Sequence, residues 1–421
     1  MIRPPIALVL ALALGPLTSS CRGPAAGEPP AGEPRSGRWR GVFETPGGEL
    51  PFELVFDRAG GSLRAELVNG DEHAPFSSVE RSAEGLVLSM PHYDSRLVLK
   101  VLPGGRALEG RWERRTRGAA PFRLPLRAEL TDAPRFTPRT GAGPPDTAAL
   151  EGRWEVRFAD ADEPSVGLFE ADPDGSARGT FLAATGDERF LAGLLDGRVL
   201  RLSGFDGARA VLVRAEIGPQ GIMRGDLWSR DTYHVRFEGT RTAGAARVLP
   251  DGFSLARWND AVPLGSVQAL DLDGRAVRLD DPRFAGGARL IEVFGTWCPN
   301  CNDAIVDLVA LGREYRDRGL SIVGLAFELE DDPARNRRLV EAFRDRYGVD
   351  FPLLLGGTVD DARSRKALPG LEGALAYPTL LLAAADGRVV AVHVGWAGPA
   401  TGGEHARLME ELRARIERLL D

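Results

Sequence analysis

Short runs of alternating apolar and polar residues, separated by Gly, Asp and Asn, fill residues 37–130 and again residues 150–242. Each stretch holds about eight such runs at roughly ten-residue spacing, a pattern typical of antiparallel strands joined by polar turns. A sheet of this kind loses its exposed edges most simply by closing into a small barrel. The pattern therefore predicts two all-β antiparallel modules, each a meander or a barrel.

The two β modules share landmarks, which predicts that they are repeats of one unit. The triplet Gly-Arg-Trp at 37–39 returns at 152–154, and the same triplet at 110–112 has a counterpart that ends in Trp228. A large aromatic residue that recurs at one strand position is usually a core residue, so we expect these tryptophans to fill the modules rather than to stack on a ligand. Residues 131–149, rich in Pro, Thr and Gly, are the expected linker.

Beyond residue 258 the apolar spacing changes to that of an α/β unit. A buried strand at 289–294 leads directly into Cys298-Pro299-Asn300-Cys301, and helical spacing follows as far as Gly319. Further elements are expected as a hairpin at 267–279, strands at 320–326, 351–355, 379–383 and 389–394, and helices at 333–347 and 404–420. This order resembles a thioredoxin-like α/β layer, which we place at 261–421.

The chain has three cysteines, Cys21, Cys298 and Cys301, too few for a disulfide-stapled scaffold or a four-cysteine zinc site. No metal and no cofactor are expected. The pair at 298 and 301 lies where a strand passes into a helix, and the free N–H groups and dipole of a helix N-terminus stabilise a thiolate. Cys298 is therefore the expected nucleophile toward a partner's disulfide, and Cys301 the cysteine that resolves the mixed disulfide.

A proline opens the late strand at 379–383, where it would normally block ladder hydrogen bonds. In the thioredoxin fold a cis-proline occupies this position beside the cysteine pair, and the residue before it offers backbone hydrogen bonds to an extended substrate. Tyr377-Pro378 resembles that pair, which predicts a cis peptide bond. A trans proline at the start of an edge strand is the alternative.

Several motifs of the C-terminal region together resemble the TlpA/ResA-like thiol–disulfide oxidoreductases. They are the sequence FGTWCPNC with Asp303 after it, the run at 324–328, Tyr377-Pro378-Thr379, and GWAGP at 395–399. The resemblance covers about residues 261–421 and implies exchange of protein disulfides, with Trp297, Pro299, Tyr377 and Pro378 at the substrate. Members are typically exported, held at a membrane and used as reductants. The implied partners are protein thiols and disulfides, with an electron donor such as a membrane thiol–disulfide transporter.

One position departs from the family pattern. Many members carry a glutamate three residues after the second cysteine, where this chain has Ala304. Glu292, six residues before Cys298 on the buried strand, is the expected substitute, because burial would raise its pKa and let it take the proton of Cys301. Asp303 is the second candidate, and a solvent-facing Glu292 without a proton role stays open.

Polar residues without a recognisable spacing are expected at the surface, since isolated histidines and carboxylates seldom mark a site. They are His73, His92, His234, Glu328 and Glu330.

The N-terminal residues have the pattern of an export signal. Arg3 precedes an unbroken apolar run at 6–14, which is too short for a bilayer core of about 30 Å but fits a signal peptide. The sequence LTSSC at 17–21 resembles a bacterial lipobox, with its leucine four rather than three positions before the cysteine. We expect a signal peptide at 1–20, lipidation of Cys21, a Pro-rich tether at 21–36 and a location on the periplasmic side of the cell envelope. An ordinary signal peptide cut nearby is the alternative.

Composition narrows the remaining functions. The 53 Lys and Arg residues against 60 Asp and Glu leave a net charge of −7, so the chain has no basic footprint for nucleic acid. A hydrophobic fraction of 43% excludes wholesale disorder. The leading hypothesis is an exported, lipid-anchored thiol–disulfide oxidoreductase that reduces protein disulfides. The alternatives are a thiol peroxidase of the same fold, although Thr296 stands one position short of a T-x-x-C setting, and an envelope binding or adaptor protein with an accessory redox domain.

Overall fold

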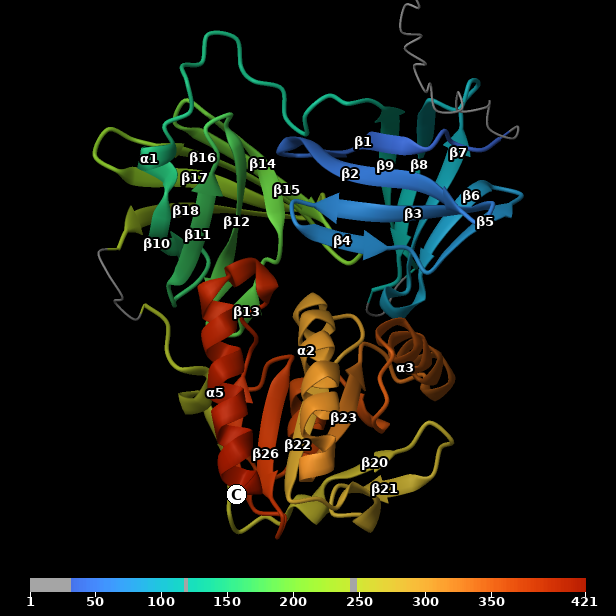
Figure 1. Ribbon diagram of the computed structural model, residues 1–421, viewed down its shortest axis with the longest axis vertical. Coiled ribbons are helices and arrows are strands. Elements are labelled where there is room, and N and C mark those ends of the chain that lie inside the picture. Colours follow the sequence, from blue (N-terminus) through green and yellow to red (C-terminus); the bar gives the residue numbers. More distant parts are fainter. Residues whose placement is uncertain (1–31, 117–119, 243–247) are drawn as a thin grey trace, which may run out of the picture.

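Three large sheets make up most of the computed structural model, which describes residues 32–116, 120–242 and 248–421 (Figure 1). Two sheets form the β modules in the upper part of Figure 1, and the third is the core of the C-terminal unit below them. No helix within these three ranges has the length and apolar character needed to cross a membrane. The expected signal peptide, Cys21 and most of the tether lie outside the described residues.

The first β module is a nine-stranded antiparallel sheet that curls almost to closure. Its strands are β1 (Gly37–Thr45), β2 (Gly48–Ala59), β3 (Ser62–Asn69), β4 (Glu72–Pro75), β5 (Ser78–Ser82), β6 (Gly85–Met90), β7 (Ser95–Val101), β8 (Ala107–Arg114) and β9 (Phe122–Leu130). The order β4-β3-β2-β1-β9-β8-β7-β6-β5 leaves β4 and β5 as edges. The chain itself bridges these edges, because the amide of Phe76 donates to Ala65 on β3 (2.9 Å) and that of Ser77 to Ser89 on β6 (2.8 Å).

The second β module is a closed barrel. Its elements are α1 (Thr147–Leu150), β10 (Gly152–Phe158), β11 (Ser165–Ala171), β12 (Ser176–Ala183), β13 (Gly186–Asp187), β14 (Leu191–Asp196), β15 (Val199–Phe205), β16 (Ala210–Ile217), β17 (Ile222–Ser229) and β18 (Tyr233–Arg241). The order β11-β10-β18-β17-β16-β15-β14-β12 is closed by pairing of β11 with β12.

Both expected all-β modules are therefore present, but each has nine strands where the sequence pattern indicated eight. The additional strands, β4 and β13, are four and two residues long, too short to show an alternation of apolar and polar residues. Corresponding strands follow the same order around both sheets. That the two modules are copies of one unit stays a prediction.

The two β modules complete one another's apolar interior. Phe205, at the end of β15 in the second module, inserts into the core of the first. Its ring centroid lies 4.9 Å from that of Phe43, 5.0 Å from that of Phe52 and 4.8 Å from that of Trp112. The modules therefore pack as one body rather than as two beads on a linker.

Three of the four recurring tryptophans are core residues, as expected. Trp39, Trp112 and Trp154 have no exposed surface. Trp228 differs from its counterpart: it is half-buried, packs against the core of the first module and stacks on His234 with ring centroids 4.9 Å apart.

The C-terminal unit is a seven-stranded mixed sheet covered by helices. Its sheet is formed by β20 (Gln268–Leu270), β21 (Ala276–Arg278), β22 (Ala288–Phe294), β23 (Leu320–Glu328), β24 (Leu353–Thr358), β26 (Thr379–Ala384) and β27 (Val389–Val394). Its helices are α2 (Pro299–Tyr315), α3 (Pro333–Tyr347), α4 (Asp361–Ala367) and α5 (Gly403–Leu420), and a separate strand pair joins β19 (Ala256–Trp258) to β25 (Leu371–Gly373). In the order β21-β20-β24-β23-β22-β26-β27, strands β22 to β24 are parallel and β26 is antiparallel. The predicted thioredoxin-like fold is confirmed.

Central strand β22 is buried along its whole length and separates two apolar cores. Leu290 and Phe294 face the cores beneath α2, α3 and α5, whereas Ile291 and Val293 face the core that includes β19 and β25. In Figure 1, α2 and α5 lie in front of this sheet. Since β22 runs directly into α2, the strand delivers the cysteine pair to the first turn of a helix.

The C-terminal unit begins before residue 261, since Ala256 and Trp258 of β19 are part of its core. Short elements had no sequence signal: α4 and β25 are seven and three residues long.

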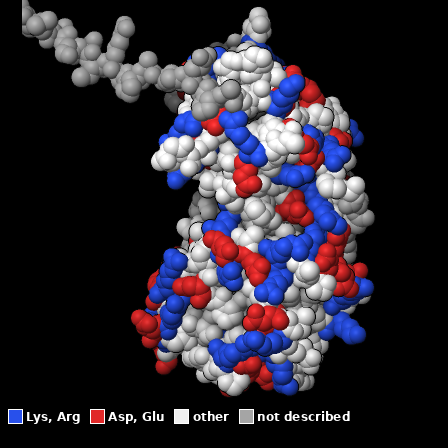
Figure 2. All heavy atoms as spheres, turned by 90° about the vertical axis from the view of Figure 1, so that its right-hand side faces the viewer, with Lys and Arg blue, Asp and Glu red and all other residues white. Residues whose placement is uncertain are grey.

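Short 3₁₀ helices lie between the strands and helices of the described chain. They are η1 (Pro91–Tyr93), η2 (Gly252–Ser254), η3 (Leu264–Ser266), η4 (Pro282–Phe284), η5 (Arg316–Arg318) and η6 (Pro399–Thr401). Side chains of both charge signs alternate over the face shown in Figure 2.

His92 is not the surface residue that the sequence suggested. It is 1% exposed on η1, with its ring 4.2 Å from that of Tyr93 and 5.9 Å from that of Tyr347 on α3. Burial and the charge of Arg346 lower the pKa of His92 well below its ordinary value. The expectation fails because His92 packs against α3 of the C-terminal unit, a contact that the local spacing of residues does not reveal.

Candidate active site

The cysteine pair lies at the N-terminus of α2, as the sequence predicted. Cys298 caps the helix: its Sγ accepts the amide N–H of Cys301 at 3.3 Å, and its thiol donates to the carbonyl of Tyr377 at 3.2 Å. Both cysteines are unbonded thiols, with Cys298 5% exposed and Cys301 fully buried. Pro299 occupies the first helical position, where the missing N–H of proline has no cost.

The pKa values of the two cysteines move in opposite directions. Burial raises the pKa of Cys298, but hydrogen bonds from the thiol and amide of Cys301, the charge of Arg209 and the amide of Asn300 outweigh it, so that the pKa lies below its ordinary value. Burial, the hydrogen bond to Cys298 and the charges of Cys298 and Glu292 raise the pKa of Cys301 well above its ordinary value. The arrangement therefore favours a thiolate at the first cysteine and a thiol at the second.

Glu292 lies on β22 between Ile291 and Val293 and is buried, as the sequence predicted. It has no exposed surface, and neither carboxylate oxygen has a hydrogen-bond partner among the described residues. Burial and the charge of Cys298 raise the pKa of Glu292 well above its ordinary value. Asp303, the second candidate, is held elsewhere, since both its oxygens accept from Arg189 (2.9 and 2.7 Å).

Tyr377 and Pro378 are joined by a cis peptide bond, as predicted. The ring of Tyr377 meets that of Trp297 edge to face, with centroids 5.4 Å apart. Trp297 is fixed by its indole N–H, which donates to Phe327 at the end of β23 (2.9 Å). Of the four residues expected at the substrate, Trp297 and Tyr377 are half-buried, whereas Pro299 and Pro378 are buried.

Glu328 is a buried part of this site rather than a surface carboxylate. It is 1% exposed and accepts from the amide of Thr296 at 3.0 Å and from its hydroxyl at 2.9 Å. Burial raises the pKa of Glu328 to about 7, against the hydrogen bonds from Thr296 and the charge of Arg335. The carboxyl thereby holds the backbone two positions before Cys298.

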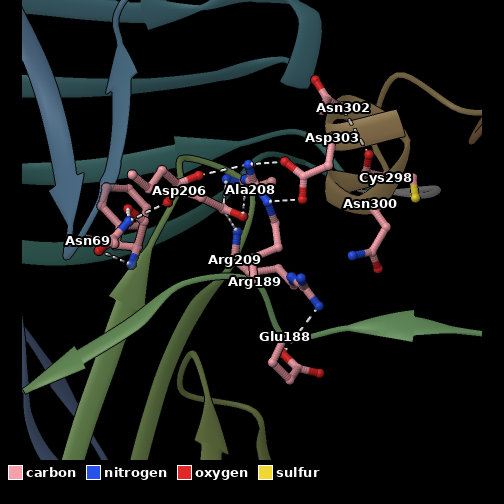
Figure 3. Close-up of polar contacts among 12 residues, drawn as sticks. Asn69, Glu188, Arg189, Asp206, Ala208, Arg209, Cys298, Asn300, Asn302 and Asp303 are labelled. Atoms are coloured by element: carbon pink, nitrogen blue, oxygen red, sulfur yellow. Dashed lines mark hydrogen bonds and ion pairs between the residues drawn. The ribbon is translucent and has the colours of Figure 1, made fainter. Parts of the chain in front are cut away.

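The second β module reaches the redox site, which no sequence pattern indicated (Figure 3). The carbonyl of Asp187 on β13 accepts from the side-chain amide of Asn300 at 3.2 Å. Two residues further along, Arg189 forms the bidentate ion pair with Asp303 on α2. Arg209 also donates to the Asp187 carbonyl, at 3.1 Å, which brings its charge next to the cysteine pair.

The first β module contributes at the same place. Arg114 at the end of β8 donates from Nη2 to the carbonyl of Trp297 at 2.9 Å. Glu72 on β4 forms an ion pair with Arg189 at 2.7 Å. All three units of the described chain therefore meet around the cysteine pair.

Among the residues that the structure describes, no group of three or more His, Cys, Asp or Glu side chains is arranged to hold a metal ion.

Comparisons with known proteins concern the C-terminal unit. The sequence model of the Redoxin family matches residues 258–403. Thiol-disulfide oxidoreductase ResA of Halalkalibacterium halodurans is 28% identical over 149 residues, which are 35% of this chain and 71% of that protein. Thioredoxin-like protein YneN of Bacillus subtilis is 27% identical over 30% of this chain and 65% of its own length, and a ResA of Bacillus anthracis is 27% identical over 30% and 64%. The chain thus spans between 64% and 71% of the length of these relatives.

Similar solved structures cover a slightly larger share of the chain. A putative thiol:disulfide interchange protein DsbE from Chlorobium tepidum aligns with 39% of this chain and 98% of its own, at 17% identity and a TM-score of 0.29. MTB DsbF aligns with 38% of this chain and 98% of its own, at 18% identity and a TM-score of 0.27. The family match and the curated relatives confirm a TlpA/ResA-like domain of the thiol–disulfide oxidoreductase type at the C-terminus.

Proposed function

We propose that this protein is an exported, lipid-anchored thiol–disulfide oxidoreductase that reduces disulfides of other proteins. The observation that carries the proposal is the asymmetry of the cysteine pair. Cys298 caps α2 with a lowered pKa, whereas the buried Cys301 has a raised one. The proposed organisation is a signal peptide at 1–20, a tether at 21–36, repeated β modules at 37–130 and 150–242, and the redox domain at 261–421, extended at its start to β19, whose residues Ala256 and Trp258 are part of its core.

The exchange proceeds in two steps. The Cys298 thiolate attacks one sulfur of the partner's disulfide, so that a mixed disulfide forms and the other partner sulfur leaves as a thiolate that takes a proton from water. Cys301 then loses its proton and attacks Cys298 Sγ, which releases the second partner sulfur. The partner gains two electrons, and the cysteine pair becomes a disulfide that an external dithiol donor must reduce.

Glu292 is the proposed acceptor of the Cys301 proton. A carboxyl with a raised pKa is a suitable base near neutral pH, and its burial next to the cysteine pair leaves no competing polar partner among the described residues. Glu292→Gln should slow resolution of the mixed disulfide and flatten its pH dependence. Glu341→Gln, on the half-exposed side of α3, is the matched control. An unchanged rate and pH profile in Glu292→Gln would remove Glu292 from the mechanism.

Trp297, Pro299, Tyr377 and Pro378 are the proposed substrate contacts. Tyr377 supports this assignment because its carbonyl already accepts the thiol of Cys298, so a substrate strand beside it would lie within reach of the sulfur. Tyr377→Ala should raise KM for a disulfide peptide while the alkylation rate of Cys298 changes little. Equal losses in both measurements would speak against substrate contact.

Trapping tests the reaction directly. In Cys301→Ser the mixed disulfide cannot be resolved, so the variant should accumulate partners linked through Cys298, which mass spectrometry identifies. Cys298→Ser is the matched control and should trap none. Equal yields from the two variants would contradict the assigned order of attack.

The direction of electron flow has its own test. A reduction potential of the cysteine pair near that of thioredoxin, about −270 mV, supports a reductant, whereas a value near about −120 mV would make the protein an oxidant.

The anchor is tested separately from the chemistry. Cys21→Ser should abolish incorporation of a labelled fatty acid and release the chain from membranes, with redox activity retained. Label incorporation in Cys21→Ser would exclude lipidation at this residue.

A further inference from the structure

The N-terminus of α2 is covered by the β modules, although a dithiol that exchanges with partners needs access. Cys298 is 5% exposed, Asn300 is 9% exposed, and Pro299 between them is buried. The cover comes from residues more than one hundred positions earlier in the chain. Beside Cys298, the rings of Trp297 and Tyr377 are half-buried and in contact, and together they are called the rim of the site.

The turn at 184–189 of the second module is fitted closely to the redox site. The carbonyl of Asp187 accepts from the Asn300 amide, and its carboxylate accepts the amide N–H of Gly398 at 2.6 Å. A Cβ added at Gly186 would lie 2.4 Å from Oδ1 of Asn300, and one added at Gly395 would lie 2.7 Å from the backbone of Thr185. Backbone here packs on the active-site loops without room for a side chain.

A buried cluster of charges holds this turn in place (Figure 3). Arg189, whose side chain is 11% exposed, pairs with both oxygens of Asp303, with Asp206 at 3.0 Å and with Glu72 at 2.7 Å. These carboxylates belong to all three units of the chain. Removing one member of such a cluster leaves another charge poorly compensated, so the docked arrangement is strongly specified.

The first module covers the neighbouring side. The guanidinium of Arg114 joins the C-terminal unit to the second β module. Its Nη2 donates to the carbonyl of Trp297, and its Nη1 donates to the carbonyl of Ala208. A partner sulfur must approach Cys298 Sγ to a bond length of about 2.05 Å. The turn at 184–189 contacts Asn300 and Arg114 contacts Trp297, so the two β modules lie against residues on both sides of Cys298, which is itself 5% exposed.

We propose that the turn at 184–189, held by Arg189 on Asp303, is a wall of the redox site that restricts Cys298 to disulfides carried on extended, flexible segments. The inference rests on the proposed function and deepens it, because it names the class of substrate. Asp187 and Arg189 are then specificity-determining residues supplied by a β module.

The test compares three maleimides of equal chemistry on the reduced full chain with Cys21→Ser and Cys301→Ser, in which Cys298 is the remaining thiol. The first is N-ethylmaleimide, the second is fixed to the end of a flexible peptide, and the third is fixed by a short linker to the surface of a small folded protein. The first two should react at similar rates. The third should react more slowly by at least about tenfold, which corresponds to about 1.4 kcal/mol of discrimination.

Two variants open the wall by different routes. Asp303→Asn removes the bidentate pair but leaves Arg189 its pairs with Glu72 and Asp206, and Gly186→Ala inserts a methyl group against Asn300. In both variants the rate at which Cys298 reacts with the protein-borne maleimide should rise at least about fivefold relative to its rate with N-ethylmaleimide. The circular dichroism spectrum should stay unchanged. Arg178→Gln removes an exposed arginine of the same module, which pairs with Glu170, and should change neither rate.

Each outcome decides. Equal reaction of the small and the protein-borne maleimide in the parent chain, or equal acceleration of both by the opening variants, would overturn the wall. If the peptide-borne maleimide does not react with Cys298, the proposed access by extended segments is wrong. If N-ethylmaleimide does not react with Cys298 near neutral pH, Cys298 is not a reactive thiolate, and the proposed function is wrong instead.

Discussion

Replacing Glu292 should change how stability depends on pH. The carboxyl is fully buried without a hydrogen-bond partner among the described residues, and burial raises its pKa well above the ordinary 4.5. Between pH 4.5 and the folded-state pKa, the folded protein keeps a proton that the unfolded chain has lost. Glu292 therefore costs stability as pH rises through this window, by about 1.4 kcal/mol per pH unit at most.

The assay follows unfolding of the C-terminal unit by urea through pulse labelling of Cys301, which has no exposed surface in the folded protein. Wild type and Glu292→Gln are compared at about pH 5, 6 and 7, so that the titration of groups not coupled to Glu292 cancels in the difference. Relative to wild type, the variant should gain stability as pH rises from about 5 toward the folded-state pKa of Glu292, by at most about 1.4 kcal/mol per pH unit. A difference that stays constant with pH would refute a raised pKa at Glu292.

Three further predictions concern other parts of the molecule. Arg209→Gln should raise the pKa of Cys298 and slow its alkylation near pH 6, whereas Arg209→Lys should not, because the charge of Arg209 favours the thiolate; the pH dependence of absorbance near 240 nm checks this. Glu328→Ala leaves the amide of Thr296 without its acceptor and should lower the free energy of unfolding in urea by about 1–3 kcal/mol, with Glu328→Gln less costly. Trp154→Ala should destabilise the second β module by about 3–5 kcal/mol in calorimetry, since the whole indole is buried.

The sequence predicted the C-terminal fold because its signals are local. β22 is one unbroken apolar run apart from Arg289 and Glu292, which is the pattern of a strand buried on both faces. α3 begins at the capping Asp332 with Pro333 in its first turn and ends at Gly348 with φ of 59°. Such caps fix helix boundaries without knowledge of the tertiary structure. The β modules were recognisable by alternation, but strands of two to four residues were not.

The candidate site divides in the same way. Cys298 and Cys301 could be found from their spacing at a junction of strand and helix, whereas Pro378 was found from its resemblance to the proline of the thioredoxin fold. Glu328 was misjudged because its burial depends on the loop that passes over the end of β23. Arg189 had no signal, since an arginine in an arginine-rich chain is indistinguishable from a solvated one until its carboxylate partners from three units are brought together.

The kinds of contact at the two module boundaries differ, and the difference bears on function. Phe205 joins the β modules through a shared apolar core, whereas each apolar core of the C-terminal unit is built from residues beyond 252. The contacts described at the redox site are hydrogen bonds and ion pairs through Arg114, Asp187 and Arg189. Buried ion pairs add little net stability because desolvation offsets their attraction, while they strongly disfavour misaligned docking. The boundary at the redox site is therefore specified by polar groups whose positions must match, which supports the proposed wall as one fixed arrangement beside the cysteine pair.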